Sequence, residues 1–252
     1  ADIMRTLGVS IDPESFNPVL VDFYQRVGYR PEALANYLLL LGWSLDDRTE
    51  HFTRDEMVKL FNLERINQSP ASFDPQKMMA FEERWMQALP LDEKAAIVAP
   101  YLTQLGLLSP VPSSEENARL RAVVVATGDR LKVAGDIVNY SEFFEDDSAF
   151  TYDLKAFSKR LQGEGSAERL LAFRKVLEAL NKFDAETIKV GLHDFVATND
   201  IKVGAIIHAV RVAVTGKAVG FGLFEGMALL GRDACLARID RALALANNED
   251  TP

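Results

Sequence analysis

Cysteine, histidine and long apolar runs are all scarce in this chain of 252 residues. The single cysteine, Cys235, excludes a disulfide framework and a cysteine-rich zinc site, and is typical of a protein of the reducing cytosol. The most apolar stretch, around residues 38–41, is far shorter than the roughly 20 residues that a membrane span needs. The N-terminal residues lack the basic and then apolar pattern of a secretory signal. We therefore expect a cytoplasmic protein without a membrane partner.

Catalytic motifs are also missing. None of the three histidines, His51, His193 and His208, stands in a spaced pair that could bind zinc, and neither a nucleophile elbow nor a phosphate-binding glycine loop occurs. Cys235 is predicted to be a small buried core residue, as free cysteines usually are. The sequence therefore predicts no catalytic residue and no metal site, and favours a binding module over a catalyst.

Local helix signals recur along almost the whole chain. Thr53 with Glu56, and Ser113 with Glu116, predict capping boxes, and Asp74 ahead of a proline predicts another helix start. No convincing alternating strand is present, so we expect an all-α chain of roughly ten to thirteen helices in two or three bundled lobes. The expected helices cover residues 31–41, 54–63, 76–89, 92–105, 117–126, 137–144, 153–161, 166–183, 185–197, 202–214, 223–230 and 233–246, with breaks near 90 and 147.

The first of these helices carries the most apolar face. Pro31 suits the first helical position, and Leu34, Leu38 and Leu41 recur at the spacing of one helix face. Gly42 is expected to end the helix in the left-handed conformation.

Positive charge is in deficit overall but gathers locally. Lys and Arg number 28 against 37 Asp and Glu, a net charge of −9, which excludes a uniformly basic nucleic-acid coat. Residues 201–224 nevertheless contain no acid, while Lys202, Arg211 and Lys217 are basic and Phe221 and Phe224 are interleaved with glycines. Such a segment could hold RNA, because Arg bonds bases or phosphates and aromatic faces stack on unpaired bases.

The simpler alternative is a helix over 202–214 with a glycine-rich turn after it, in which Val203, Ile206, Ile207 and Val210 serve only the core. A second basic cluster flanks the turn at 127–129 and contains Arg119, Arg121, Arg130 and Lys132. Charged residues at helix ends are common on solvated faces, so this cluster also has an alternative without function.

Several longer strings resemble one known family. Residues 28–44 and 61–77 strongly resemble the segment of bacterial glutamyl-tRNA synthetases, class I enzymes, that follows their catalytic domain. Residues 211–217 and 223–231 resemble the family's terminal anticodon-binding lobe, and Arg130-Leu-Lys132 with Phe143-Phe-Glu-Asp-Asp147 falls in register with its first anticodon lobe. The resemblance runs from about Tyr24 to Arg241 in one order.

The resemblance implies an all-α architecture of a helical stem-contact domain (1–90), a first anticodon-binding lobe (91–150) and a second, C-terminal lobe (151–252). It implies tRNA(Glu) and the catalytic domain of the parent synthetase as partners, with no DNA partner. The parent enzyme would use ATP and Mg²⁺ to attach glutamate to tRNA, while this chain itself would hold no cofactor.

The family's catalytic Rossmann half is absent from this chain, because its His-x-Gly-His and Lys-Met-Ser-Lys-Ser type strings do not occur. We therefore expect either a fragment of a synthetase, which the absence of an initiator Met favours, or a stand-alone paralogue of its C-terminal half. Either form alone is expected to be inactive in aminoacylation. The competing hypothesis is a stand-alone helical tRNA-binding or protein–protein interaction module, which the acidic net charge favours.

The family pattern also implies site residues. Arg130 would meet the third anticodon base, because a side chain that only donates matches the acceptor edge of cytosine and not the N–H of uracil. The second lobe's pocket would be lined by His208, Arg211, Gly220, Phe221 and Leu223, and Lys217 would contact a phosphate. Two segments depart from the pattern: the Gly220-Phe221 pair replaces a polar residue and a proline, and residues 80–85 replace a Trp-Leu-Asn-Gly-like string.

Overall fold

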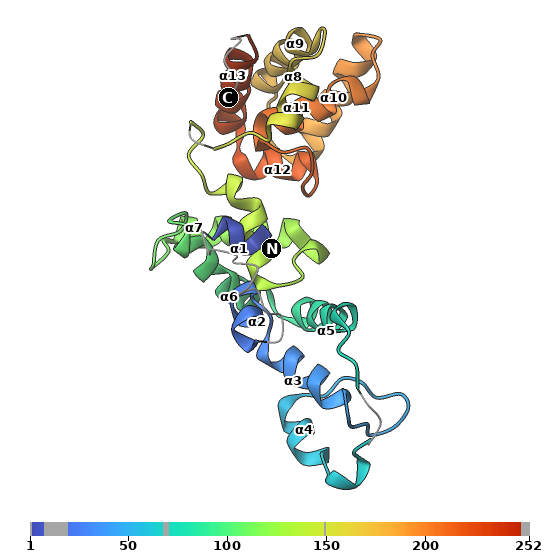
Figure 1. The fold of residues 1–252 in the computed structure, drawn as a ribbon. Coiled ribbons are helices and arrows are strands. Elements are labelled where there is room, and N and C mark those ends of the chain that lie inside the picture. Colours follow the sequence, from blue (N-terminus) through green and yellow to red (C-terminus); the bar gives the residue numbers. More distant parts are fainter. Residues whose placement is uncertain (1, 8–19, 68–70, 149, 248–252) are drawn as a thin grey trace. The chain divides into compact units, whose positions relative to one another are not determined.

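The chain is helical, as expected. The computed structural model describes residues 2–7, 20–67, 71–148 and 150–247, and in this part the only extended pairing is one bridge between Trp43 and Ile66. The chain divides into two compact units, unit 1 of residues 1–139 and unit 2 of residues 140–252 (Figure 1). This division differs from the three expected domains, whose bounds stay a prediction. No helix in the described ranges has the length and apolar character needed to cross a bilayer.

Unit 1 contains seven α-helices in its described part. Its two capping boxes form as expected: the Thr53 side chain accepts from the backbone of Glu56, and Ser113 does the same with Glu116. Asp74 likewise caps the helix that begins at the next residue. The helices are α1 (Asp2–Thr6), α2 (Val21–Val27), α3 (Pro31–Leu40), α4 (Arg54–Leu60), α5 (Pro75–Ala88), α6 (Leu91–Gln104) and α7 (Ser114–Thr127), with 3₁₀ turns at Leu63–Arg65 and Gly128–Arg130. A further 3₁₀ segment, Ala134–Phe143, begins in unit 1 and ends in unit 2.

Helix α3 buries Asn36 and Tyr37 more deeply than its leucines. Leu38 is 47% exposed, whereas Asn36 and Tyr37 are buried against α5 and the 50–52 segment. The reason is polar: the Asn36 amide donates to Glu50 O and accepts from Phe52 N, both at 3.0 Å. Gly42 is not left-handed, contrary to the prediction; α3 ends in a right-handed turn at Leu41. The spacing of apolar residues does not reveal that Asn36 is buried, because Asn36 is buried through its hydrogen bonds to backbone groups.

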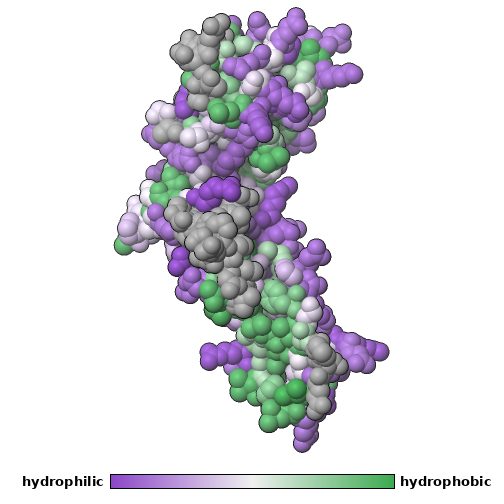
Figure 2. Space-filling view, in the orientation of Figure 1, coloured by the Kyte–Doolittle hydropathy of each residue, from purple (hydrophilic) through white to green (hydrophobic). Residues whose placement is uncertain are grey.

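Apolar side chains also remain on the surface of unit 1. Leu38, Phe61, Leu63 and Ile66 are each at least 44% exposed, and Figure 2 shows apolar residues gathered over the α3 and α4 region. Helix α4 has no buried residue at all. This part of the chain therefore depends on caps and turns more than on core packing.

Unit 2 is a bundle around one apolar core. Phe157, Phe173, Leu192, Val210 and Ile239, at most 1% exposed, stand at its centre, and Cys235 is buried there as predicted. The expected helix 202–214 is divided, because the non-helical Ile206 separates a 3₁₀ turn at Val203–Ala205 from α11. The helices are α8 (Leu154–Leu161), α9 (Ser166–Ala179), α10 (Ala185–Thr198), α11 (Ile207–Thr215), α12 (Leu223–Leu230) and α13 (Arg232–Asn247).

Candidate nucleic-acid interface

Arg130 lies on the surface of unit 1, at the end of the 3₁₀ turn that follows α7. The turn is anchored on both sides: Thr127 is buried and donates to Val123 O at 2.7 Å, and Leu131 is 1% exposed. Gly128 supplies the positive φ (+55°) that turns the chain. The local fold therefore presents the Arg130 guanidinium to solvent from a fixed backbone.

In unit 2, Arg211 is tied to the turn that precedes α12. Its Nη1 donates to Phe221 O at 2.9 Å, and a side chain at Gly220 would stand 3.5 Å from the same Nη1. A small pocket is lined by Arg211, Gly220, Phe221 and Leu223, four of the residues expected at the site, together with Glu142, Phe143, Thr215, Val219, Gly222 and Gly226. The structure thus brings these four together. The hollow holds about one water molecule, so any base would rest on its rim.

The Phe221 ring is not the exposed aromatic face that the sequence suggested. It is 3% exposed and stacks on Phe143, with centroids 4.8 Å apart, and on Tyr140 at 5.5 Å. Leu223 is also buried, at 4% exposed, as the first residue of α12. The Phe221 ring thus lies against Phe143 and Tyr140 and is not open to solvent. Phe221 therefore contributes to the shape of the pocket as an inward-packed ring.

Lys217 forms an ion pair inside unit 2. Its Nζ lies 2.6 Å from Glu142 Oε2, and Glu142 is 3% exposed. Burial raises the pKa of the Glu142 carboxyl, and the Lys217 charge opposes that rise. The lysine expected at a phosphate therefore also neutralises a buried acid that lines the pocket.

His208 is exposed on α11, one turn before Arg211. Partial burial and then the charges of Arg160 and Arg211 lower its imidazole pKa, and Arg160 belongs to α8, which packs against α11. Sequence reasoning missed Arg160. The signal was present in residues 154–163, which contain Lys155, Lys159 and Arg160 and no acid.

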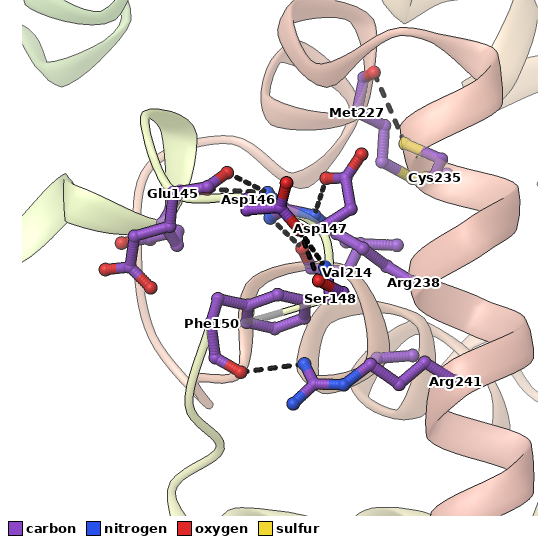
Figure 3. A network of polar contacts seen from close by, with 12 residues as sticks. Glu145, Asp146, Asp147, Ser148, Phe150, Val214, Met227, Cys235, Arg238 and Arg241 are labelled. Atoms are coloured by element: carbon purple, nitrogen blue, oxygen red, sulfur yellow. Dashed lines mark hydrogen bonds and ion pairs between the residues drawn. The ribbon is translucent and has the colours of Figure 1, made fainter. Parts of the chain in front are cut away.

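Arg238 was also missed, and it lies in a network of polar contacts with Asp147 and Val214 (Figure 3). It is 1% exposed and donates to Asp147 Oδ1 at 2.6 Å, to Val214 O at 2.9 Å and to Glu142 O at 2.8 Å. Its guanidinium lies over the Phe150 ring, 4.3 Å from the centroid. One side chain of α13 therefore links the end of α11 to Glu142, Asp147 and Phe150. No sequence pattern distinguishes Arg238 from the other arginines of its helix.

No metal site joins this arrangement in the described ranges, where no three His, Cys, Asp or Glu side chains are grouped to hold an ion. The only cysteine is buried, and burial raises the pKa of the Cys235 thiol to about 12. What unit 2 offers instead is a set of fixed donors and cations around Arg211.

The known proteins to which this chain is similar are glutamate–tRNA ligases. Among curated proteins, the chain is 35% identical over 221 residues to the glutamate–tRNA ligase of Herpetosiphon aurantiacus, covering 88% of this chain and 45% of that protein. It is 38% identical over 213 residues to the glutamate–tRNA ligase of Saccharopolyspora erythraea, covering 84% and 42%. The chain spans less than half the length of the curated relatives it matches.

A solved structure is similar over the same extent. The glutamate tRNA ligase from Elizabethkingia meningosepticum, crystallised in complex with its amino acid, matches with a TM-score of 0.75 and 25% identity, over 88% of this chain and 42% of that one. Residues 17–80 match the family model of the catalytic domain of class I tRNA synthetases (E and Q). Residues 93–243 match the anticodon binding domain model. The match covers more than half of the chain, which therefore belongs to the anticodon binding domain family.

Proposed function

We propose that this chain is the tRNA(Glu)-binding part of a glutamate–tRNA ligase. The observation that carries the proposal is the match of residues 93–243 to the anticodon binding domain, in a chain whose relatives are glutamate–tRNA ligases. In the whole enzyme, a separate catalytic domain would use ATP and Mg²⁺ to attach glutamate to the tRNA. This chain would position the tRNA, since binding energy gained far from the reacting atoms supports catalysis.

In this proposal Arg130 reads the third anticodon base from its exposed turn. Arg211, Gly220, Phe221 and Leu223 shape the pocket beside which a second base is held. His208 and Lys217 flank it, and Lys217, which also pairs with Glu142, contacts a phosphate. The buried rings supply rigidity, and the arginine guanidinium groups supply recognition.

The test is a binding titration of the chain with tRNA(Glu). We expect Arg130→Ala and Arg211→Ala each to weaken binding by about 1–3 kcal/mol, the size of a good base contact. Arg119→Ala is a matched control, because Arg119 is an exposed arginine in the first half of α7 that pairs with Glu115. Unchanged affinity for both site variants would disprove the assignment.

A protein–protein interaction module is the second candidate, favoured by the net charge of −9. Gel retardation separates the two functions: tRNA should retard the chain, and added salt should weaken that binding steeply. A chain that leaves tRNA(Glu) unretarded even at low salt would favour the second candidate. We also expect the chain alone to give no glutamate-dependent ATP–pyrophosphate exchange.

A further inference from the structure

Two segments of unit 2 that contain no acidic residue lie side by side. Residues 154–163 include α8, and residues 201–224 include α11. The two helices pack together, and the backbone of Asp153, just before α8, donates to Gly216 O, just after α11, at 2.8 Å (Figure 1). Segments about 50 residues apart therefore combine into one region without negative charge along either helix.

The exposed side of α8 is basic. Ala156, Phe157 and Leu161 face the core, while Lys155 and Lys159 stand one turn apart and are exposed. No ion pair joins either lysine to another described residue. Other surface cations, such as Lys77, Arg121 and Lys132, each pair with an acid. The α8 lysines keep their charge available for a ligand.

Arg160 of α8 and Arg211 of α11 add to this charge. Arg160 follows Lys159 directly, and His208 and Arg211 stand one turn apart on α11, the helix that packs against α8. Partial burial, and then the charges of Arg160 and Arg211, lower the pKa of the His208 imidazole. Arg211 Nη1 also donates to Phe221 O in the turn that lines the pocket.

We propose that Lys155, Lys159 and Arg160 of α8, with His208 of α11, bind backbone phosphates of the tRNA beside the pocket. We call these four residues the α8–α11 basic surface. The inference rests on the proposed function, and it adds a second kind of contact: phosphate contacts supply affinity and orientation without reading sequence. Lysines suit this role, since a flexible ammonium group can follow a backbone whose bases are held elsewhere.

The experiment compares Lys155→Gln/Lys159→Gln with a matched control, Lys175→Gln/Lys182→Gln, in the 252-residue chain. All four lysines are exposed residues of unit 2, and each double variant removes two positive charges. Affinity for tRNA(Glu) is measured by filter binding from 50 to 300 mM KCl, on the order of the range where counterion release is steep. Circular dichroism melts verify that both variants fold as the unchanged chain does.

We expect the α8 variant to lose about 10- to 50-fold in affinity near 0.1 M salt, and its plot of log K against log salt to flatten by about 1.4–1.8. The same loss should occur with a tRNA whose anticodon has been changed, because phosphates carry no sequence. The control should bind as the unchanged chain does. Arg160→Gln should flatten the plot by a further amount of about 0.7–0.9.

The outcomes separate the two proposals. If the unchanged chain binds tRNA and the α8 variant binds equally well with the same salt slope, the inference is wrong and the proposed function stands. A loss of affinity without a change in slope also overturns it, since the lysines would then act through the fold. If the unchanged chain does not bind tRNA at all, the proposed function fails first.

Discussion

Arg238 and Asp147 form a 2.6 Å ion pair in which the arginine is 1% exposed and the aspartate side chain is 40% exposed. The same guanidinium donates to two backbone carbonyls and packs on Phe150. A buried arginine is tolerated only when its donors are satisfied, as they are here. The pair thereby fixes the 142–147 segment, which also carries Glu142 and Phe143 of the pocket.

Arg238→Met should therefore destabilise unit 2 by about 3 kcal/mol or more, because it leaves Asp147 and the buried carbonyls without a donor. Arg174→Met is the control, because Arg174 of α9 forms a partly exposed ion pair with Asp240 of α13. We expect this variant to lose about 1 kcal/mol of stability or less. Urea unfolding followed by circular dichroism measures both. Trp43 and Trp85 lie in unit 1, so the tryptophan fluorescence transition should move little in either variant. Equal losses of stability in the two variants would show that the buried Arg238 contacts stabilise unit 2 no more than a surface ion pair does.

Lys217 has two roles that can be tested separately: it neutralises the buried Glu142, and we propose that it contacts a tRNA phosphate. Lys217→Met should cost about 1–2 kcal/mol of unit 2 stability, because Glu142 remains buried without its cation. Adding Glu142→Gln should restore most of that stability, since a neutral amide costs less to bury. We expect the double variant to remain weaker than the unchanged chain in a tRNA titration, as a phosphate contact requires. Full recovery of affinity would assign Lys217 a structural role alone.

Glu82 predicts a pH dependence for unit 1. The residue is fully buried, its Oε2 accepts from Arg30 N at 2.9 Å, and Oε1 has no hydrogen-bond partner among the described residues. Burial raises the pKa of Glu82 to about 7 from an ordinary value of 4.5. Between these pH values the folded chain keeps a proton that the unfolded chain releases, so stability falls as the pH rises and levels off above about 7.

Glu82→Gln should remove this fall, which amounts to at most about 3 kcal/mol. The variant should match the unchanged chain near pH 4.5 and exceed it at pH 8. Tryptophan fluorescence during urea unfolding reports on this unit. Glu64→Gln, at an exposed position, is the control and should keep the pH dependence of the unchanged chain. A Glu82→Gln variant that still loses stability between those pH values would refute the prediction.

Gly216 directly follows α11, and its carbonyl oxygen accepts a hydrogen bond from the backbone of Asp153, just before α8. It has φ +72°, and an added Cβ would lie 2.3 Å from Thr151 O. Gly216→Ala should therefore destabilise unit 2 by more than about 1 kcal/mol, from backbone strain and from the clash together. Gly204→Ala is the control, because nothing lies within 4 Å of its Cβ position. Thermal melts by circular dichroism should show the melting temperature falling only for Gly216→Ala; a similar fall for both would contradict the stated cause.

The places where sequence reasoning succeeded share a local cause. The capping boxes at Thr53 and Ser113 form between residues three apart, so each could be read without knowing the fold. The helix at 223–230 has the predicted bounds because Gly231 ends it with a positive φ. The family, too, was visible in short strings of residues, and the match to the anticodon binding domain confirms it.

The failures concern partners far apart along the chain. Leu38 of α3 is 47% exposed, whereas Asn36 and Tyr37 are buried and accept hydrogen bonds from the backbone of Phe52 and of Asp74. The sequence alone determined the helical class, the caps and the family. Only the tertiary structure decided that Phe221 faces inward, that Arg238 anchors the 142–147 segment and that α8 lies beside α11, because each depends on residues more than 50 positions away whose closeness no local pattern encodes.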